Sequence, residues 1–146
     1  MNQSHNKRPR GGFLQLPASN IKVFFLFALS LFFTYAGITH FTNAAFYVGI
    51  MPPWIPAHLE LVYISGVCEI MAGIGVLIPR LRSLAGLGLV ALLIAVYPAN
   101  IHMALNPQLF PVIPVVALYV RLALQFVAIY WAYTVTRPDP QPVYLD

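Results

Sequence analysis

A long apolar run between Val23 and Phe41 contains no Asp, Glu, Lys or Arg. An α-helix needs about 20 mostly apolar residues to cross the hydrocarbon core of a bilayer, and this run fills that length. A secretory signal peptide also joins a basic segment to an apolar core, but that core is normally about 7–15 residues long. The length of the run therefore favours a membrane-spanning helix that the mature protein keeps.

Three further apolar segments follow, separated by stretches of proline, asparagine and basic residues. Their pattern predicts helical spans over residues 21–40, 59–78, 83–105 and 115–135. Only 8% of the 146 residues are charged, whereas a soluble domain carries about 25% charged residues. We therefore expect an all-α integral membrane protein, a bundle of four transmembrane helices with no soluble domain.

The basic residues outside the apolar segments gather on one side of the predicted bundle. Lys and Arg occur near the N-terminus, between the second and third spans and after the fourth, but not in residues 42–58 or 106–114. Because Lys- and Arg-rich loops stay in the cytoplasm, both termini are predicted to be cytoplasmic and the location to be the cytoplasmic membrane. The net charge of +4 then reflects topology and not nucleic-acid binding.

The segments outside the four spans are short. Residues 1–20 lack apolar periodicity and are expected to form a disordered basic tail, and residues 136–146 a Pro-rich tail. Residues 42–58 combine aromatic side chains with several prolines, which is typical of a stiff segment at the membrane interface.

Two charged residues, Glu69 and Arg121, are predicted to lie within the bilayer. A charge at mid-bilayer costs about 2.5–3.5 kcal/mol even on insertion scales, so such residues are candidates for function. The predicted topology places both in the outer half of the bundle, at depths that an Arg side chain can bridge. Two interpretations stay open: a buried ion pair that fixes helix packing, or a site for a ligand or a proton.

Other polar side chains fall in the same half of the predicted bundle. Gln125 follows Arg121 by four residues and shares its helix face. Asn100 comes just after Pro98, which predicts a kink because proline cannot donate to the helix ladder. We therefore expect a polar pocket open toward the outer surface, with six candidate ligand-binding residues: Glu69, Asn100, Arg121, Gln125, His102 and His40.

Metal and thiol chemistry are disfavoured by the sequence. His40 and His102 form no H-x-x-x-H or C-x-x-C-H pattern, so we predict no metal or haem site. Cys68 is the only cysteine, which excludes a disulfide or a dithiol relay within one chain. We interpret Cys68 as a packing residue in an apolar helix.

Several short motifs occur in a fixed order along the four spans. They are residues 37–41, Met51-Pro52-Pro53-Trp54, Ser65-Gly66 with Glu69, Pro98-Ala99-Asn100 with Met103, and Arg121 with Gln125. Together they resemble the DoxX family of small membrane proteins over residues 21–133. This resemblance implies a four-helix bundle in a bacterial or archaeal cytoplasmic membrane, in a family named after a subunit associated with a terminal quinol oxidase. It also implies roles for Glu69, Asn100, Arg121 and Gln125.

These features lead to one leading functional hypothesis and two alternatives. The leading one is a redox-associated accessory subunit that holds a quinone or similar lipid-like molecule, with Arg121 and Gln125 as donors and Glu69 as proton acceptor. A non-catalytic scaffold or assembly factor is the main alternative, and a transporter fits less well because no inverted repeat is visible. Expected partners are the lipid bilayer, another membrane or peripheral redox protein, and further copies of the chain. Whether the chain is an enzyme stays open.

Overall fold

The computed structural model describes residue 17 and residues 19–138, and helices are the only regular secondary structure in this part of the chain, with no strand. The predicted tails lie largely outside the described residues. Four helices, α1 (Asn20–Thr42), α3 (His58–Gly75), α4 (Arg82–Leu105) and α5 (Val115–Thr136), are long and apolar enough to cross a membrane. The prediction of an all-helical chain with four such helices is confirmed.

Three details differ from the predicted helices. Residues 42–58 include a short helix, α2 (Ala44–Gly49), and a single 3-10 turn, η1 (Pro107–Leu109), precedes α5. The second long helix ends at Gly75 and not near residue 78. The reason is that the amides of Leu77 and Ile78 bond to carbonyls three residues back, which tightens the chain into successive turns before Pro79.

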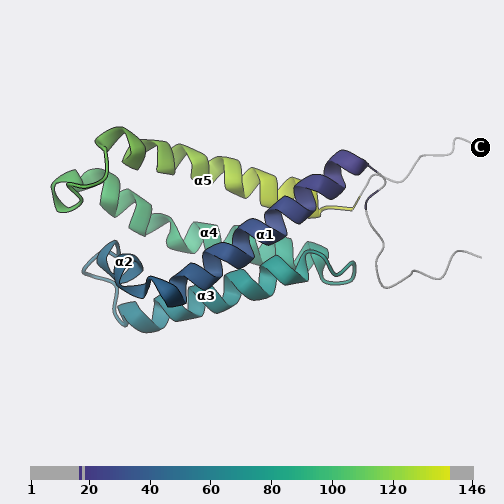
Figure 1. Cartoon of the computed structure of the whole chain (residues 1–146), viewed down its shortest axis with the longest axis horizontal. Helices are drawn as coiled ribbons and strands as arrows, with labels where there is room; N and C mark the ends of the chain where they lie inside the picture. Colours follow the sequence, from purple (N-terminus) through teal and green to yellow (C-terminus); the bar gives the residue numbers. More distant parts are fainter. Residues whose placement is uncertain (1–16, 18, 139–146) are drawn as a thin grey trace, which may run out of the picture.

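The long helices form two pairs, α1 with α3 and α4 with α5 (Figure 1). The start of α1, the end of α5 and the loop between α3 and α4 lie together at one end of the molecule, which we call the terminal end. Helices α2 and η1 lie at the opposite end, which we call the α2 end. The two pairs converge at the terminal end and diverge toward the α2 end.

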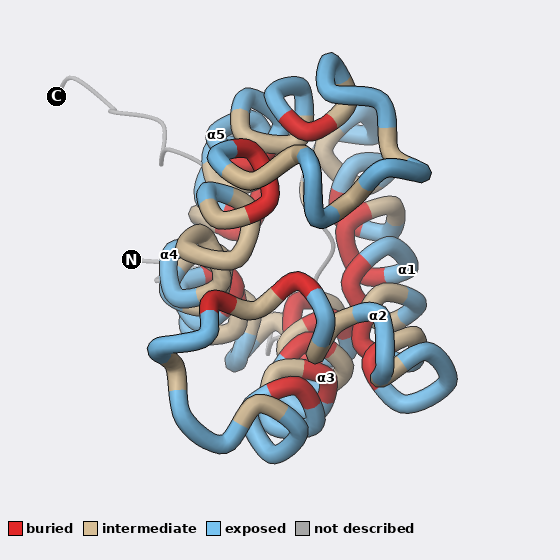
Figure 2. The backbone as a smooth tube through the Cα atoms, turned by 90° about the vertical axis from the view of Figure 1, so that its left-hand side faces the viewer, coloured by how far each residue is buried: buried red, intermediate tan, exposed pale blue. Residues whose placement is uncertain are grey.

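Two groups of buried apolar side chains hold this arrangement. The larger group joins all four long helices in the converging half of the bundle: Leu26, Leu29, Phe33, Val76, Leu89, Ala132 and Val135. The smaller group ties α4 and α5 to the chain just after α2: Ile50, Met103, Ala104 and Leu118. Figure 2 shows buried positions on the inward faces of the helices and exposed positions on the outward faces.

The outward faces are strongly apolar. Phe24, Leu31 and Tyr130 are each exposed by about two thirds or more of their surface, at 68%, 73% and 71%. Such a surface suits lipid, since lipid-facing helices need no polar coat. Cys68 also faces outward, so its interpretation as a packing residue is wrong. The buried stripe of α3 contains Val62, Gly66, Glu69 and Gly73, and Cys68 lies off that stripe.

Glycines allow the backbones within each helix pair to come close. A Cβ atom added to Gly37 would lie 2.6 Å from the carbonyl oxygen of Gly66, so α1 and α3 touch backbone to backbone. Gly86 on α4 similarly accommodates Thr136 on α5. Gly88 has no heavy atom within 4 Å of the position where its Cβ would lie, so only Gly86 serves this purpose on α4.

Candidate functional site

A cavity of about 360 Å³ lies between the two helix pairs toward the α2 end. Most of its wall is apolar, with Phe32 and Phe33 from α1 and Leu93 and Val96 from α4 among the lining residues. This volume falls within the range of about 300–1,000 Å³ that small-molecule sites occupy. The polar side chains on the wall are few: His40, Tyr47, Ser65, Glu69, Asn100 and Arg121.

The cavity brings together four of the six candidate residues, one from each long helix: His40, Glu69, Asn100 and Arg121. Gln125 is buried behind Asn100 and supports it. His102 lies elsewhere, at the α2 end, where its Nδ1 atom is 3.1 Å from the side-chain nitrogen of Asn106 and its ring is nearly perpendicular to that of Phe110.

A chain of hydrogen bonds fixes Arg121 to α4. Its Nε and Nη2 atoms donate to Oδ1 of Asn100 over 3.3 Å and 3.0 Å. The amide nitrogen of Asn100 donates to Oε1 of Gln125, and Nε2 of Gln125 donates to the carbonyl oxygen of Leu93. Each amide therefore has one orientation that satisfies both of its ends. A guanidinium has five N–H donors, so Arg121 retains donors beyond the two that bind Asn100.

Glu69 and Arg121 form no ion pair in the part of the chain that the structure describes. Oε2 of Glu69 instead lies 3.5 Å from Nε2 of His40 on α1. The close packing of α1 on α3 causes this choice of partner, since a Cβ on Gly66 would lie only 2.7 Å from Cβ of His40. The ion-pair interpretation of Glu69 with Arg121 is thus wrong, although both side chains line the same cavity.

The carboxyl group of Glu69 is poorly satisfied. The residue is only 8% exposed, and its Oε2 atom is buried without a hydrogen-bond partner. The 3.5 Å separation from His40 permits electrostatic attraction but exceeds the length of a good hydrogen bond. A buried polar atom left in this state indicates a functional role or a missing partner, because satisfied burial is the rule in folded proteins.

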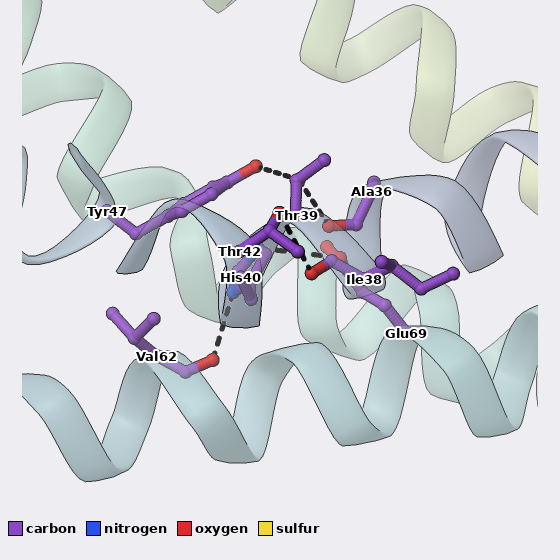
Figure 3. Close-up of polar contacts among 8 residues, drawn as sticks. All are labelled: Ala36, Ile38, Thr39, His40, Thr42, Tyr47, Val62 and Glu69. Atoms are coloured by element: carbon purple, nitrogen blue, oxygen red, sulfur yellow. Dashed lines mark hydrogen bonds and ion pairs between the residues drawn. The ribbon is translucent and has the colours of Figure 1, made fainter. Parts of the chain in front are cut away.

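The short helix α2 adds a residue that the sequence analysis missed. Tyr47 stacks on the ring of His40 with a centroid separation of 3.8 Å and an interplanar angle of 28° (Figure 3). The hydroxyl of Thr39 donates to the carbonyl of Ala36 over 2.6 Å, so the Tyr47 hydroxyl has to be the donor to Thr39, also over 2.6 Å. In the sequence, Tyr47 stands out only by lying seven residues after His40. The helix ends before Asn43, so helical periodicity does not predict on which side of the chain Tyr47 lies.

Residues 29–136 match a family model described as "Domain of unknown function (DUF8561)". The chain belongs to this family. No curated protein and no solved structure matches the chain. The DUF8561 region begins within α1 and ends at the last residue of α5, so it contains every residue that lines the cavity.

The cavity of the DUF8561 region separates two kinds of polar chemistry. Arg121, oriented by Asn100, offers a positive charge with N–H donors. His40 and Glu69, on the opposite helix pair, offer groups that accept and release protons. No group of three or more His, Cys, Asp or Glu side chains is placed to hold a metal ion within the described ranges. The arrangement suits an uncharged or weakly acidic organic molecule with polar atoms at one end.

Proposed function

We propose that this DUF8561 protein binds a quinone or a similar lipid-like molecule in the cavity and acts as an accessory subunit of a membrane redox system. The observation that carries the proposal is the composition of the cavity wall, which is mostly apolar and places its ionisable groups on opposite sides, with Arg121 on one helix pair and His40 with Glu69 on the other. Sites of this kind hold a ligand by apolar contact and orient it by a few polar groups.

A quinone matches both features of the wall. Its ring carries two carbonyl oxygens on opposite sides, which need donors, and its tail needs an apolar groove. Arg121 supplies N–H donors to one oxygen, while the His40–Glu69 pair is available to the other. The aromatic and aliphatic residues Phe32, Phe33 and Val96 supply the apolar contact. The motif order that resembles the DoxX family favours the same class of ligand.

We further propose that the termini face the cytoplasm and that the cavity lies in the outer half of the cytoplasmic membrane. In support, the Lys and Arg residues of the described chain gather at the terminal end, with the exception of Arg121 in the cavity. Lys22 donates to the carbonyl of Arg137 over 2.6 Å, and Arg80 and Arg82 lie in or beside the loop between α3 and α4. Such clustering of Lys and Arg marks the cytoplasmic side.

Cysteine labelling in intact cells tests this topology. Cys68→Ala removes the single native thiol, and Trp54→Cys or Leu81→Cys then places one thiol at an exposed position near the α2 end or the terminal end. We expect a membrane-impermeant maleimide to label the Trp54→Cys variant in intact cells and the Leu81→Cys variant only after lysis. Labelling in the reverse pattern would overturn the orientation, and the outer position of the cavity with it.

Mass spectrometry of the organic extract tests the ligand. Protein purified in native lipid discs is expected to retain quinone near one molecule per chain. Arg121→Gln removes the charged donor and keeps a side chain that can bond to Asn100, and we expect about 10–100-fold less quinone, because a hydrogen bond to a charged group contributes about 1.5–3 kcal/mol. Arg80→Gln is the matched control, since this arginine lies away from the cavity and its loss leaves quinone unchanged.

Ordinary phospholipid as the sole lipid in all three preparations would contradict the quinone proposal. It would favour the alternative, in which the polar residues order the bundle and the apolar outer surface recruits another membrane protein. Under that alternative the purification yields a stable protein partner whose amount is unchanged by Arg121→Gln.

A further inference from the structure

The protonation state of the His40 ring follows from its neighbours. Nδ1 of His40 lies 2.9 Å from the carbonyl oxygen of Val62 on α3 (Figure 3). A carbonyl oxygen can only accept a hydrogen bond, so Nδ1 has to carry the hydrogen atom. In the neutral ring the other nitrogen, Nε2, is then a bare acceptor, and it is this nitrogen that faces Glu69.

Two bare acceptors cannot face one another at this site without cost. Nε2 of His40 and Oε2 of Glu69 are 3.5 Å apart, and both residues are more than nine-tenths buried. If the two atoms hold no proton, Glu69 is a buried carboxylate without a partner. If they hold two protons, His40 is a buried cation beside a neutral acid. Each state has a net charge that is costly to bury. A single proton, on either atom, leaves the pair neutral overall and joins its two members.

We propose that His40 and Glu69 hold one proton between them and form the proton-accepting site of the cavity, for a ligand whose head carries an ionisable hydroxyl group, as a quinol does. In this step the O–H bond of the ligand breaks, its proton moves to the pair, and both His40 and Glu69 then carry a proton. The pair then has one positive charge, and the negative charge formed on the ligand in the same cavity offsets it. The electron pair stays on the ligand oxygen, and Arg121 stabilises the resulting anion. No electron transfer is involved. The identity of the ligand rests on the function proposed above, whereas the shared proton rests on the geometry alone.

The other polar groups on the helices around the pair are poor proton sources. On α2, the Tyr47 hydroxyl donates to Thr39 and so does not bond to the pair. On α4, Asn100 does not ionise, and its two polar ends are already bonded to Arg121 and Gln125. On α5, Arg121 stays charged. On α3, the hydroxyl group of Ser65 does not ionise in the physiological pH range. Within the cavity lining, His40 and Glu69 are therefore the groups that can exchange a proton with a ligand.

Nitrogen NMR of histidine-labelled protein in lipid tests the shared proton. Glu69→Gln is expected to leave His40 neutral with its hydrogen on Nδ1, because the amide that this substitution introduces donates to Nε2. In the wild type, His40 is expected either as an imidazolium or as the same tautomer beside a protonated Glu69. His40→Gln assigns the signal by its loss.

His58 provides an internal control, because its hydrogen is expected on the other ring nitrogen. Its Nε2 atom lies 3.1 Å from the carbonyl of Pro52, so the same reasoning places its hydrogen on Nε2. A His40 signal with hydrogen only on Nε2, or an imidazolium that persists in Glu69→Gln, would overturn the shared proton.

Calorimetry in buffers of different ionisation enthalpy tests proton exchange with a ligand. The probe is heptyl-hydroxyquinoline N-oxide, a quinone-like molecule with an ionisable hydroxyl group. The wild type is expected to bind it without releasing a proton to the buffer, and Glu69→Gln to release about one proton per probe bound. Decyl-ubiquinone lacks an ionisable hydroxyl and is expected to release none in either protein.

The outcomes separate this inference from the proposed function. Equal proton release from the wild type and Glu69→Gln would overturn the proton-accepting role of the pair, although the probe binds. Failure of both probes to bind the wild type would overturn the proposed function, and the NMR result would still confirm or overturn the shared proton.

Discussion

Asn100→Leu is expected to destabilise the bundle by about 3 kcal/mol and to abolish retention of the cavity ligand. The leucine has a similar volume but removes the acceptor for two donors of Arg121 and the donor to Gln125. Unpaired buried polar groups cost about 1–3 kcal/mol each, and more when they are charged. The loss is measurable as a lower midpoint of unfolding in a denaturing detergent, followed by helical circular dichroism.

Asn106→Leu is the matched control for this variant. Asn106 also bonds through its side chain, to Nδ1 and the carbonyl of His102, but it lies at the C-terminal end of α4 and contacts no charge of the cavity. We expect a loss of at most about 1 kcal/mol there, typical of a neutral hydrogen bond. Equal losses in the two variants would show that the Arg121–Asn100–Gln125 chain has no special role.

The four helices were predictable because their signal is local. Length and apolarity of each segment suffice to identify a spanning helix, and both are properties of consecutive residues. The short helix α2 gave no such signal, since its 6 residues are too few for a hydrophobic period to be recognised. Its consequence is functional, because α2 places Tyr47 against His40.

The sequence predicted which residues line the site better than it predicted which of them contact one another. Charged and amide residues in apolar helices stand out one by one, and four of the six candidates do line one cavity. The partner of Glu69 depends on which helix packs against α3, and helical periodicity does not contain that information. Glycines at Gly37 and Gly66 bring α1, and with it His40, next to Glu69. Arg121 is drawn instead to Asn100, on the neighbouring helix of its own pair.

The proline in α4 lies close to the amide network, but the carbonyl that joins this network is not the one that proline frees. Pro98 removes one donor from the hydrogen-bond ladder of α4 and therefore leaves the carbonyl of Ile94 without its helical partner. The polar contact that crosses to α5 at this level is made by the carbonyl of Leu93, one residue earlier, which accepts from Gln125. A helix that contains proline can thus bind a neighbouring amide through a carbonyl beside the one that proline frees.

The close contact of α1 and α3 is expected to make Gly66→Ala strongly damaging. The added methyl group would lie 2.7 Å from Cβ of His40 and 2.9 Å from the carbonyl oxygen of Gly37, and the second of these is backbone that cannot rotate away. Overpacking of this kind costs about 1–3 kcal/mol. Circular dichroism during detergent unfolding measures this loss.

The same substitution links packing to the site, because separating the two helices moves His40 away from both of its partners on α3. Its bond to the Val62 carbonyl and its approach to Glu69 both depend on the glycine contact. We therefore expect the Gly66→Ala variant to lose the single tautomer of His40 in the NMR spectrum as well as stability.

Gly88→Ala is the matched control, since it meets no atom within 4 Å, and alanine is favoured over glycine inside a helix by about 0.5–1 kcal/mol. A Gly66→Ala protein that is as stable as Gly88→Ala, with an unchanged His40 signal, would mean that α1 and α3 are not in backbone contact and that the His40–Glu69 pair is held by something else.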